Sequence, residues 1–474
     1  MPTKEKTKTE TKELEKKLKF QGKLVWDRLE EKERKEAFRF AEEYKNFLDR
    51  AKTEREAVRQ ILQAAEKEGF REISRKGGGK KFFCLNREKS IALAVLGSAP
   101  LAEGLRIIVS HVDSPRVDLK QNPLYEDADL ALFRTHYYGG IKKYQWVAIP
   151  LSLHGLIVKS DGSALNVQVG ENPDDPVFII NDLLPHLSGR TQDQKKLAEA
   201  IEGEKLTALA GSLPFSDAEA KERIKLRIME LLHQKYGLIE EDFTSAELEL
   251  VPAMKARDVG FDRSLVGSYG QDDRASAYTS LQAVLSIQDP PRTVLALFVD
   301  KEEIGSEGST GAQSLFIEEV VRLLIERSGE ALTDSLVKRI LGRSKAISAD
   351  VESALDPNYP EVHEKQNAGR IGYGVCLEKF TGHRGKAGAS DARAEFVGEV
   401  RRIFNSHKVA WQMTEIGKVD EGGGGTVAKY LAVYGMDIID CGAPVLSMHS
   451  PFEVTSKADI FEAYKAYRAF ISSP

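Results

Sequence analysis

The sequence predicts an α/β fold in which one catalytic domain is interrupted by an inserted second domain. Apolar β runs alternate with amphipathic helices near the start of the chain and again after about residue 251. Between these parts the pattern changes to short β runs and a highly charged helical stretch. The 474 residues also exceed what one hydrophobic core usually supports. We therefore predict a catalytic domain built from residues 23–118 and 251–474, with residues 119–250 inserted between its two parts.

The N-terminal part of the chain is expected to begin with helices. Residues 1–22 are a mixture of Lys, Glu and Thr with little to bury, so we expect a flexible or loosely helical segment. Apolar residues at helical spacing follow over about 31–69. Thr53 and Glu56 form the pattern of a capping box, which predicts that a second helix begins there.

The remaining elements follow from apolar spacing and turn signals. A hairpin is predicted over Leu153–Val169, with Asp161 and Gly162 at its turn. The other predicted strands are 81–84, 90–96, 104–110, one ending at Val299, and 346–350. The predicted helices are a charged stretch over about 191–240, then 274–287, 313–328, 331–342, one opened by Ser390, and a last one carrying Ile460 to Ile471.

Composition narrows the class of protein. Charged residues make up 30% of the chain and the net charge is only −5, which gives no sign of nucleic-acid binding. No apolar run approaches the roughly 20 residues of a membrane span, and the first residues lack the apolar core of a secretory signal. Three scattered cysteines predict neither a disulfide framework nor a thiolate zinc site. We expect a cytoplasmic protein without a membrane or nucleic-acid partner.

Acids and histidines stand at five places where an apolar run or turn ends. These are His111 with Asp113, Asp272 with Asp273, Glu302 with Glu303, Asp350, and His449. The carboxyl ends of neighbouring strands gather at one edge of an open α/β sheet, where ligands bind. So many converging carboxylates would repel one another unless their negative charge is neutralised, and a pair of divalent cations is the simplest way to neutralise it. The pattern predicts a two-metal hydrolase.

Each of these signals also has a simpler structural explanation. The His-Val-Asp segment could be a polar turn, the Asp pair could cap a helix, and the Glu pair could be a solvated loop. In the metal interpretation, Asp113 accepts a hydrogen bond from the imidazole of His111. One aspartate bridges two cations. One glutamate binds a metal while the other acts as general base. Five such coincidences together favour the metal interpretation.

Other catalytic chemistries find less support. Gly422–Gly425 followed by Thr426 could cradle a phosphate at a helix N-terminus, but the lysine of a P-loop is missing. We predict instead that this glycine-rich turn, with Gly424 inside it, shapes a substrate pocket. The sequence contains no Gly-x-Ser-x-Gly elbow, and its cysteines carry no nucleophile signature.

Six short motifs in this chain resemble those of the aspartyl aminopeptidase family, a group of dinuclear zinc exopeptidases. They are Ser110-His-Val-Asp-Ser-Pro115, Gln271-Asp-Asp-Arg274, Asp300-Lys-Glu-Glu-Ile-Gly-Ser-Glu307, Ser348-Ala-Asp350, Asp356-Pro-Asn-Tyr359 and Leu446-Ser-Met-His-Ser450. They occur in the family's order between about residues 110 and 450.

The resemblance implies a specific metal site. Asp272 would bridge two divalent ions, with zinc expected and cobalt or manganese as alternatives. His111 and Asp350 would complete one site, and Glu303 and His449 the other. Glu302 would be the general base, and Asp113 would orient His111.

The resemblance also implies an architecture and an assembly. The family has a three-layer α/β/α catalytic domain with a mixed sheet and an inserted, mostly β dimerisation domain. Its dimers assemble into dodecamers, so a homo-oligomer is expected. The family also places a histidine in the active site of a neighbouring subunit, and the segment ending at His154 matches this feature.

The specificity region departs from the family pattern. Asp273 stands where many members have Asn, and the segment from Glu378 to Lys386 is laid out differently. Lys379 could face the specificity pocket and favour an acidic N-terminal residue. Glu378 beside it could equally favour a basic one.

The predicted function is that of a metal-dependent aminopeptidase acting on peptides. The nearest alternative is a related dinuclear hydrolase, such as a carboxypeptidase or an N-acyl deacylase. A non-catalytic assembly protein is a more distant alternative, because it would keep all five ligands and Glu302 without a chemical reason.

Overall fold

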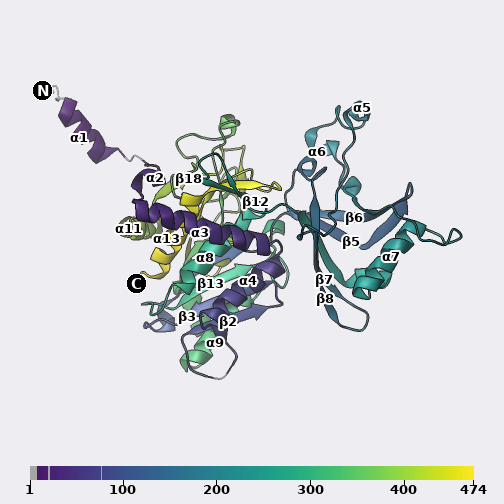
Figure 1. The fold of residues 1–474 in the computed structure, drawn as a ribbon. Helices are drawn as coiled ribbons and strands as arrows, with labels where there is room; N and C mark the ends of the chain where they lie inside the picture. Colours follow the sequence, from purple (N-terminus) through teal and green to yellow (C-terminus); the bar gives the residue numbers. More distant parts are fainter. Residues whose placement is uncertain (1–7, 20–21, 76) are drawn as a thin grey trace.

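A mixed nine-stranded sheet lies at the centre of the catalytic part of the chain (Figure 1). The computed structural model describes residues 8–19, 22–75 and 77–474. The strand order is β1 (Arg71–Glu72), β2 (Lys81–Asn86), β3 (Ser90–Val95), β13 (Val294–Val299), β4 (Arg106–His111), β14 (Lys345–Ser348), β20 (Asp437–Gly442), β16 (Val375–Glu378) and β18 (Trp411–Thr414). Strands β13, β4, β14 and β20 are mutually parallel, so their carboxyl ends meet at one edge.

Helices cover both faces of this sheet. One face packs against α3 (Glu31–Arg50), α4 (Glu54–Lys67), α8 (Gln271–Leu285), α11 (Ala394–Ser406) and α13 (Lys457–Ile471). The other packs against α9 (Phe316–Ser328), α10 (Asp334–Arg343) and α12 (Ala428–Ala432). Along β4, Ile108 enters the first core while Ile107 and Val109 enter the second. This alternation explains why the central strands are apolar throughout. The α/β prediction is confirmed as a mixed α/β fold.

The N-terminal helices agree with the sequence pattern. The side chain of Thr53 accepts a hydrogen bond from the backbone N–H of Glu56 at the start of α4, and the Glu56 side chain bonds back to the Thr53 backbone. The predicted capping box is therefore confirmed. Residues 8–18 form helix α1 (Lys8–Leu18), followed by α2 (Val25–Arg28). The rest of the expected flexible segment, residues 1–7 and 20–21, lies outside the described residues.

A second sheet with its own hydrophobic core lies to the right in Figure 1. Its order is β8 (Ala164–Val169), β7 (Leu151–Val158), β10 (Ala246–Pro252), β5 (Arg116–Asp127), β6 (Leu130–Tyr138) and β9 (Ala208–Gly211). The helices of this part are α5 (Pro185–Ser188), α6 (Leu197–Ala200) and α7 (Arg223–Tyr236). The predicted hairpin corresponds to β7 and β8. This sheet begins at Arg116 and ends at Pro252, slightly outside the predicted 119–250 boundaries.

A third, five-stranded sheet supports the loops beside the central sheet's carboxyl edge. Its order is β11 (Arg257–Val259), β12 (Leu265–Ser268), β22 (Glu453–Ser456), β21 (Pro444–Leu446) and β15 (Glu352–Ser353). A fourth, two-stranded sheet pairs β17 (Gly382–His383) with β19 (Gly423–Gly424). Within the described ranges, no helix is both long enough and apolar enough to cross a membrane.

Candidate metal centre

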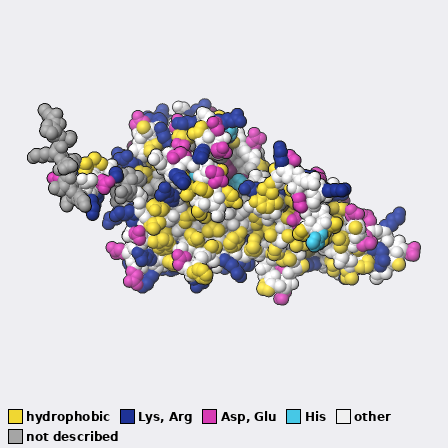
Figure 2. Space-filling model, turned by 90° about the horizontal axis from the view of Figure 1, so that it is seen from above, with side chains coloured by type: hydrophobic (Ala, Val, Ile, Leu, Met, Phe, Trp, Pro, Cys, Tyr) yellow, Lys and Arg dark blue, Asp and Glu magenta, His cyan; other side chains and the backbone are white. Residues whose placement is uncertain are grey.

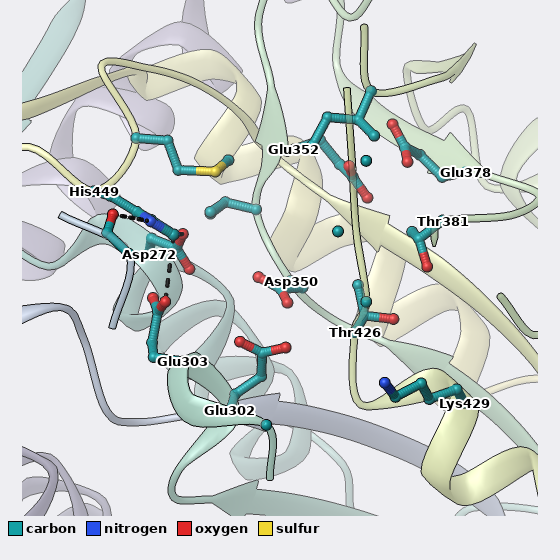
Figure 3. Close-up of a pocket in the computed structure, with 18 of the residues that line it drawn as sticks. Asp272, Glu302, Glu303, Asp350, Glu352, Glu378, Thr381, Thr426, Lys429 and His449 are labelled. Carbon is teal, nitrogen blue, oxygen red and sulfur yellow. Dashed lines mark hydrogen bonds and ion pairs between the residues drawn. The ribbon is translucent and has the colours of Figure 1, made fainter. Parts of the chain in front are cut away.

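Five predicted ligands lie together at the carboxyl edge of the central sheet (Figure 3). His111 is the last residue of β4, Glu303 lies in a 3-10 turn (Glu302–Ile304) directly after β13, and Asp350 follows β14. Asp272 is the second residue of α8, which follows β12, and His449 follows β21. The first three therefore come from the nine-stranded sheet and the other two from the five-stranded sheet. The site is built where these two sheets meet.

Asp272 stands between two groups of ligand atoms. Its Oδ1 lies 3.2 Å from Nε2 of His111, which is 3.6 Å from Oδ1 of Asp350. Its Oδ2 lies 3.1 Å from Nε2 of His449, which is 3.4 Å from Oε2 of Glu303. Each oxygen of one carboxylate thus faces a different histidine.

Backbone carbonyls fix the orientation of both histidines. Nδ1 of His111 lies 3.1 Å from the carbonyl oxygen of Asp113, and Nδ1 of His449 lies 2.9 Å from that of Gly140. A carbonyl oxygen can only accept a hydrogen bond, so Nδ1 of each histidine carries the hydrogen. Nε2 of each ring is then left without a hydrogen and points toward the carboxylates. This is the arrangement that orients a histidine toward a metal ion.

Asp113 contacts His111 as predicted, but it also positions the glutamate pair. Its Oδ1 lies 3.3 Å from Nδ1 of His111, slightly farther than its own carbonyl oxygen. Its carboxylate accepts hydrogen bonds from the backbone N–H groups of Glu302 and Glu303 at 3.1 and 3.2 Å, and from the hydroxyl of Tyr138 at 2.8 Å. Burial opposes ionisation, but the hydrogen bonds from His111 and Tyr138 hold the pKa of Asp113 below its usual value.

Glu302 lines the cavity beside the ligands and forms one group of possible metal ligands with His111 and Glu303. Its Oε2 lies 4.0 Å from Nε2 of His111. Burial raises the pKa of Glu302 to about 8, with His111 opposing the shift and Asp350 adding to it. A carboxylate with a raised pKa at the edge of a polar cavity is suited to accept and return a proton near neutral pH.

Glu453, which sequence reasoning missed, holds the two remote ligand segments together. One of its oxygens accepts from the backbone N–H groups of Gln271 and Asp272, at 2.6 and 3.1 Å. The other accepts from the backbone N–H of His449 at 2.8 Å. The only signal in the sequence is an acid at a position of β22 that the sheet buries.

The chemistry of these side chains fits divalent metal ions. Nitrogen and carboxylate oxygen donors form three groups of three whose ligand atoms lie within 4.8 Å of one another, and one of these groups joins Glu302 to His111 and Glu303. Nε2 of His111 and one oxygen of Glu303 are buried without a hydrogen-bond partner. Unpaired buried polar atoms are costly unless something binds them, and imidazole with carboxylate is a donor set that zinc accepts.

Comparison with known proteins decides the family. Residues 47–471 match the model for aminopeptidase I zinc metalloproteases, family M18. The chain belongs to the M18 family of zinc aminopeptidases. A probable M18 family aminopeptidase 1 of Clostridium acetobutylicum is 50% identical over 458 residues, covering 95% of this chain and 98% of that protein. The crystal structure of the M18 aminopeptidase of Thermotoga maritima matches with a TM-score of 0.93 at 45% identity. The match covers 96% of this chain and 100% of that chain.

This M18 aminopeptidase is therefore a peptide hydrolase, which excludes the non-catalytic assembly protein. The resemblance to aspartyl aminopeptidases is confirmed at the level of the family. An aspartyl aminopeptidase of Caenorhabditis elegans is 28% identical over 455 residues, covering 91% of this chain and 94% of that one.

His154, which is predicted to reach the active site of a neighbouring subunit, is buried within its own chain in this M18 aminopeptidase. His154 lies on β7 with about 1% of its surface exposed. Its Nδ1 is 2.8 Å from Glu56, and its Nε2 is 3.0 Å from Ser152 and 3.2 Å from Glu171. Both ring nitrogens are occupied within the same chain, so the side chain stabilises the junction between α4 and the second sheet.

We expect His154→Gln to destabilise the M18 aminopeptidase by about 1–3 kcal/mol while keeping near wild-type kcat. Burial opposes protonation, but Glu171 and Glu56 raise the pKa of His154 above its ordinary value. Because the pKa is higher in the folded than in the unfolded protein, protonated His154 stabilises the fold below about pH 6.5. This contribution is lost as the pH rises through the pKa of the folded state. Thermal unfolding should show the largest difference from wild type near about pH 6. A large loss of kcat with unchanged stability would restore the catalytic role.

Lys379, the predicted pocket residue, is not among the residues that line this cavity. Its side chain is 43% exposed and lies 4.0 Å from Asp391, whereas Glu378 lines the cavity. Gly424 does lie in the cavity wall, in the short strand opposite Gly382. Beside it, Gly423 has a φ of +137°, and a Cβ there would come within 2.2 Å of the carbonyl oxygen of Gly382. The tight pairing of these strands therefore requires glycine.

Proposed function

We propose that this aminopeptidase uses two divalent metal ions bridged by Asp272. Zinc is the ion named by the family, with cobalt or manganese as substitutes. The ligands would be His111 and Asp350 on one side and Glu303 and His449 on the other. The observation that carries the proposal is the position of Asp272, whose two oxygens lie 3.2 and 3.1 Å from the two histidines. A carboxylate placed in this way can bind one ion with each oxygen.

Glu302 is the general base of the proposed reaction. When bound, the two ions would supply Lewis-acid activation of a water and of the scissile carbonyl. Glu302 accepts the proton of the attacking water and then delivers a proton to the leaving amine. Asp113 keeps Glu302 in place through its hydrogen bond to the backbone of the turn.

Metal removal and restoration test this function. We expect the metal-stripped protein to be inactive and to regain activity after zinc, cobalt or manganese is added, with two ions bound per chain. Peptides with a free N-terminus should be cleaved and their N-acetylated counterparts should not. Full activity with one ion per chain would contradict the dinuclear proposal. Equal cleavage of blocked peptides would instead favour the deacylase or carboxypeptidase alternatives.

We also propose that the second sheet is an inserted dimerisation domain and that the chain forms a larger homo-oligomer. An aminopeptidase of Saccharomyces cerevisiae with the same fold, 22% identical and with a TM-score of 0.72, was solved as a dodecamer. Hydrophobic side chains gather across the middle of one face (Figure 2). Large exposed apolar patches often mark association surfaces. Sedimentation of the purified protein tests this, because the mass of a single chain would contradict it.

A cytoplasmic location is part of the same proposal. Cys84, Cys376 and Cys441 are all free thiols. Disulfides are usual in oxidising compartments and rare in the cytosol. Cell fractionation with an antibody to the chain tests the location.

A further inference from the structure

A second group of acids lies in the same cavity as the metal ligands. The cavity has a volume of about 440 Å³ and is lined by Asp350 and also by Glu352 and Glu378. In Figure 3, Asp350 lies between the metal ligands on one side and Glu352 and Glu378 on the other. Asp440 lies behind the wall, where its Oδ1 accepts a hydrogen bond of 2.7 Å from Thr426, a lining residue. We call Glu352, Glu378 and Asp440 the acidic subsite.

The acidic subsite is buried without a cation. Glu352, Glu378 and Asp440 are 5%, 1% and 0% exposed. Among the residues that the structure describes, no lysine, arginine or histidine forms an ion pair with any of them. Glu378 and Asp440 lie directly opposite each other on the antiparallel strands β16 and β20. Like charges opposite one another in a sheet are destabilising, so this arrangement needs an explanation.

Glu378 lines the cavity and has one buried oxygen without a hydrogen-bond donor. Its Oε1 accepts a hydrogen bond of 3.4 Å from Thr414, while its buried Oε2 has no hydrogen-bond partner. Burial raises the pKa of Glu378 to about 8, with a hydrogen bond to the carboxyl of Glu352 opposing the shift and the charge of Asp440 adding to it. A buried carboxylate with an unpaired oxygen is stabilised most by a ligand that brings a positive charge and hydrogen-bond donors.

The geometry favours an organic cation over a third metal ion. The three acids do not form one of the groups whose ligand atoms come within 4.8 Å of one another, among the residues described. Spaced acceptors suit the three donors of an ammonium group or the five donors of a guanidinium group. The hydroxyl residues Thr381 and Thr426 line the same part of the cavity and add acceptors.

The position of the subsite matches the side chain of the residue to be released. Glu352 stands two residues after the metal ligand Asp350, and two residues of chain span at most roughly 7 Å. This is comparable to the reach of a lysine or arginine side chain. A substrate whose scissile bond lies at the metal ligands can therefore place the end of its first side chain among these acids.

We propose that the acidic subsite binds the side chain of the substrate's first residue and selects N-terminal lysine or arginine. This inference rests on the proposed function of the metal centre. Lys429 also lines the cavity and would repel a basic side chain that came near it. Lys429 is only partly buried and its Nζ lies 4.6 Å from the centre of the Tyr430 ring. The three acids are more deeply buried and more numerous.

The test compares amide substrates that differ only in the first residue. We expect the wild-type enzyme with its metal ions to cleave lysine and arginine substrates with kcat/KM about 10- to 100-fold above the norleucine substrate. Norleucine has the aliphatic chain of lysine without the charge. Aspartate and glutamate substrates should be the poorest.

Glu378→Gln tests the assigned residue. The lysine-to-norleucine ratio of kcat/KM should fall about 10-fold or more, whereas Glu361→Gln, at an exposed acid outside the cavity, should keep the wild-type ratio. Preference for aspartate or glutamate, or an unchanged ratio in Glu378→Gln, would overturn the inference. The wild-type panel remains decisive if the variant does not fold. Failure to cleave any of the substrates would count against the proposed function itself.

Discussion

Glu302→Gln is expected to lower kcat by about 10²- to 10⁴-fold, the usual contribution of a general base. Glutamine has the shape of glutamate but cannot accept the proton of the attacking water. The hydrogen bond from the backbone N–H of residue 302 to Asp113 does not involve the side chain, so the turn should remain in place. Because Glu302 lies 4.0 Å from Nε2 of His111, farther than Asp272 at 3.2 Å and Asp350 at 3.6 Å, the variant should still bind two metal ions.

Steady-state kinetics and metal analysis on the same sample measure both quantities. Glu307→Gln is a matched control, since it changes an exposed acid five residues further along the same loop and should keep wild-type activity. Near wild-type turnover in Glu302→Gln would show that another group takes the proton. A loss of bound metal would mean that Glu302 is a ligand, and its role as base would have to be reassigned.

The parts of the fold that could be predicted are those that local chemistry determines. The capping box at Thr53 and Glu56 and the hairpin over 153–169 involve residues close in sequence, and both occur. The convergence of His111, Glu303 and Asp350 could also be predicted, because the carboxyl ends of parallel strands share an edge. What the pattern did not reveal is that Asp272 and His449 come from a different sheet.

The missed features depend on contacts between distant residues. Glu453 bonds to the backbone of Asp272, 181 positions away, and nothing near either residue indicates it. The burial of His154 depends on Glu56, 98 positions away. The position of Lys379 outside the cavity lining has another cause. Successive side chains of a strand point to opposite faces, so a shift of one residue at the end of β16 exchanges a lysine for a glutamate in the cavity wall.

Asp272→Ala is expected to weaken both metal sites, whereas loss of a ligand on one side should weaken one. The alanine variant removes both oxygens, which lie 3.2 and 3.1 Å from the two histidines. We expect zinc affinity to fall more than about 100-fold at both sites, since even the loss of a group that only supports a ligand costs about 10- to 100-fold. Activity at limiting zinc should fall by at least the same factor.

Asp350→Ala is the matched comparison because it lies on the His111 side only. It should retain one tightly bound ion, while Asp272→Ala should retain none after dialysis at the same free zinc concentration. The backbone N–H of residue 272 still donates to Glu453 in the alanine variant, so the start of α8 should keep its position. One ion retained by Asp272→Ala at wild-type affinity would mean that Asp272 serves a single site. The contacts of its two oxygens with the two histidines would then serve the structure, for example by neutralising protonated imidazole rings.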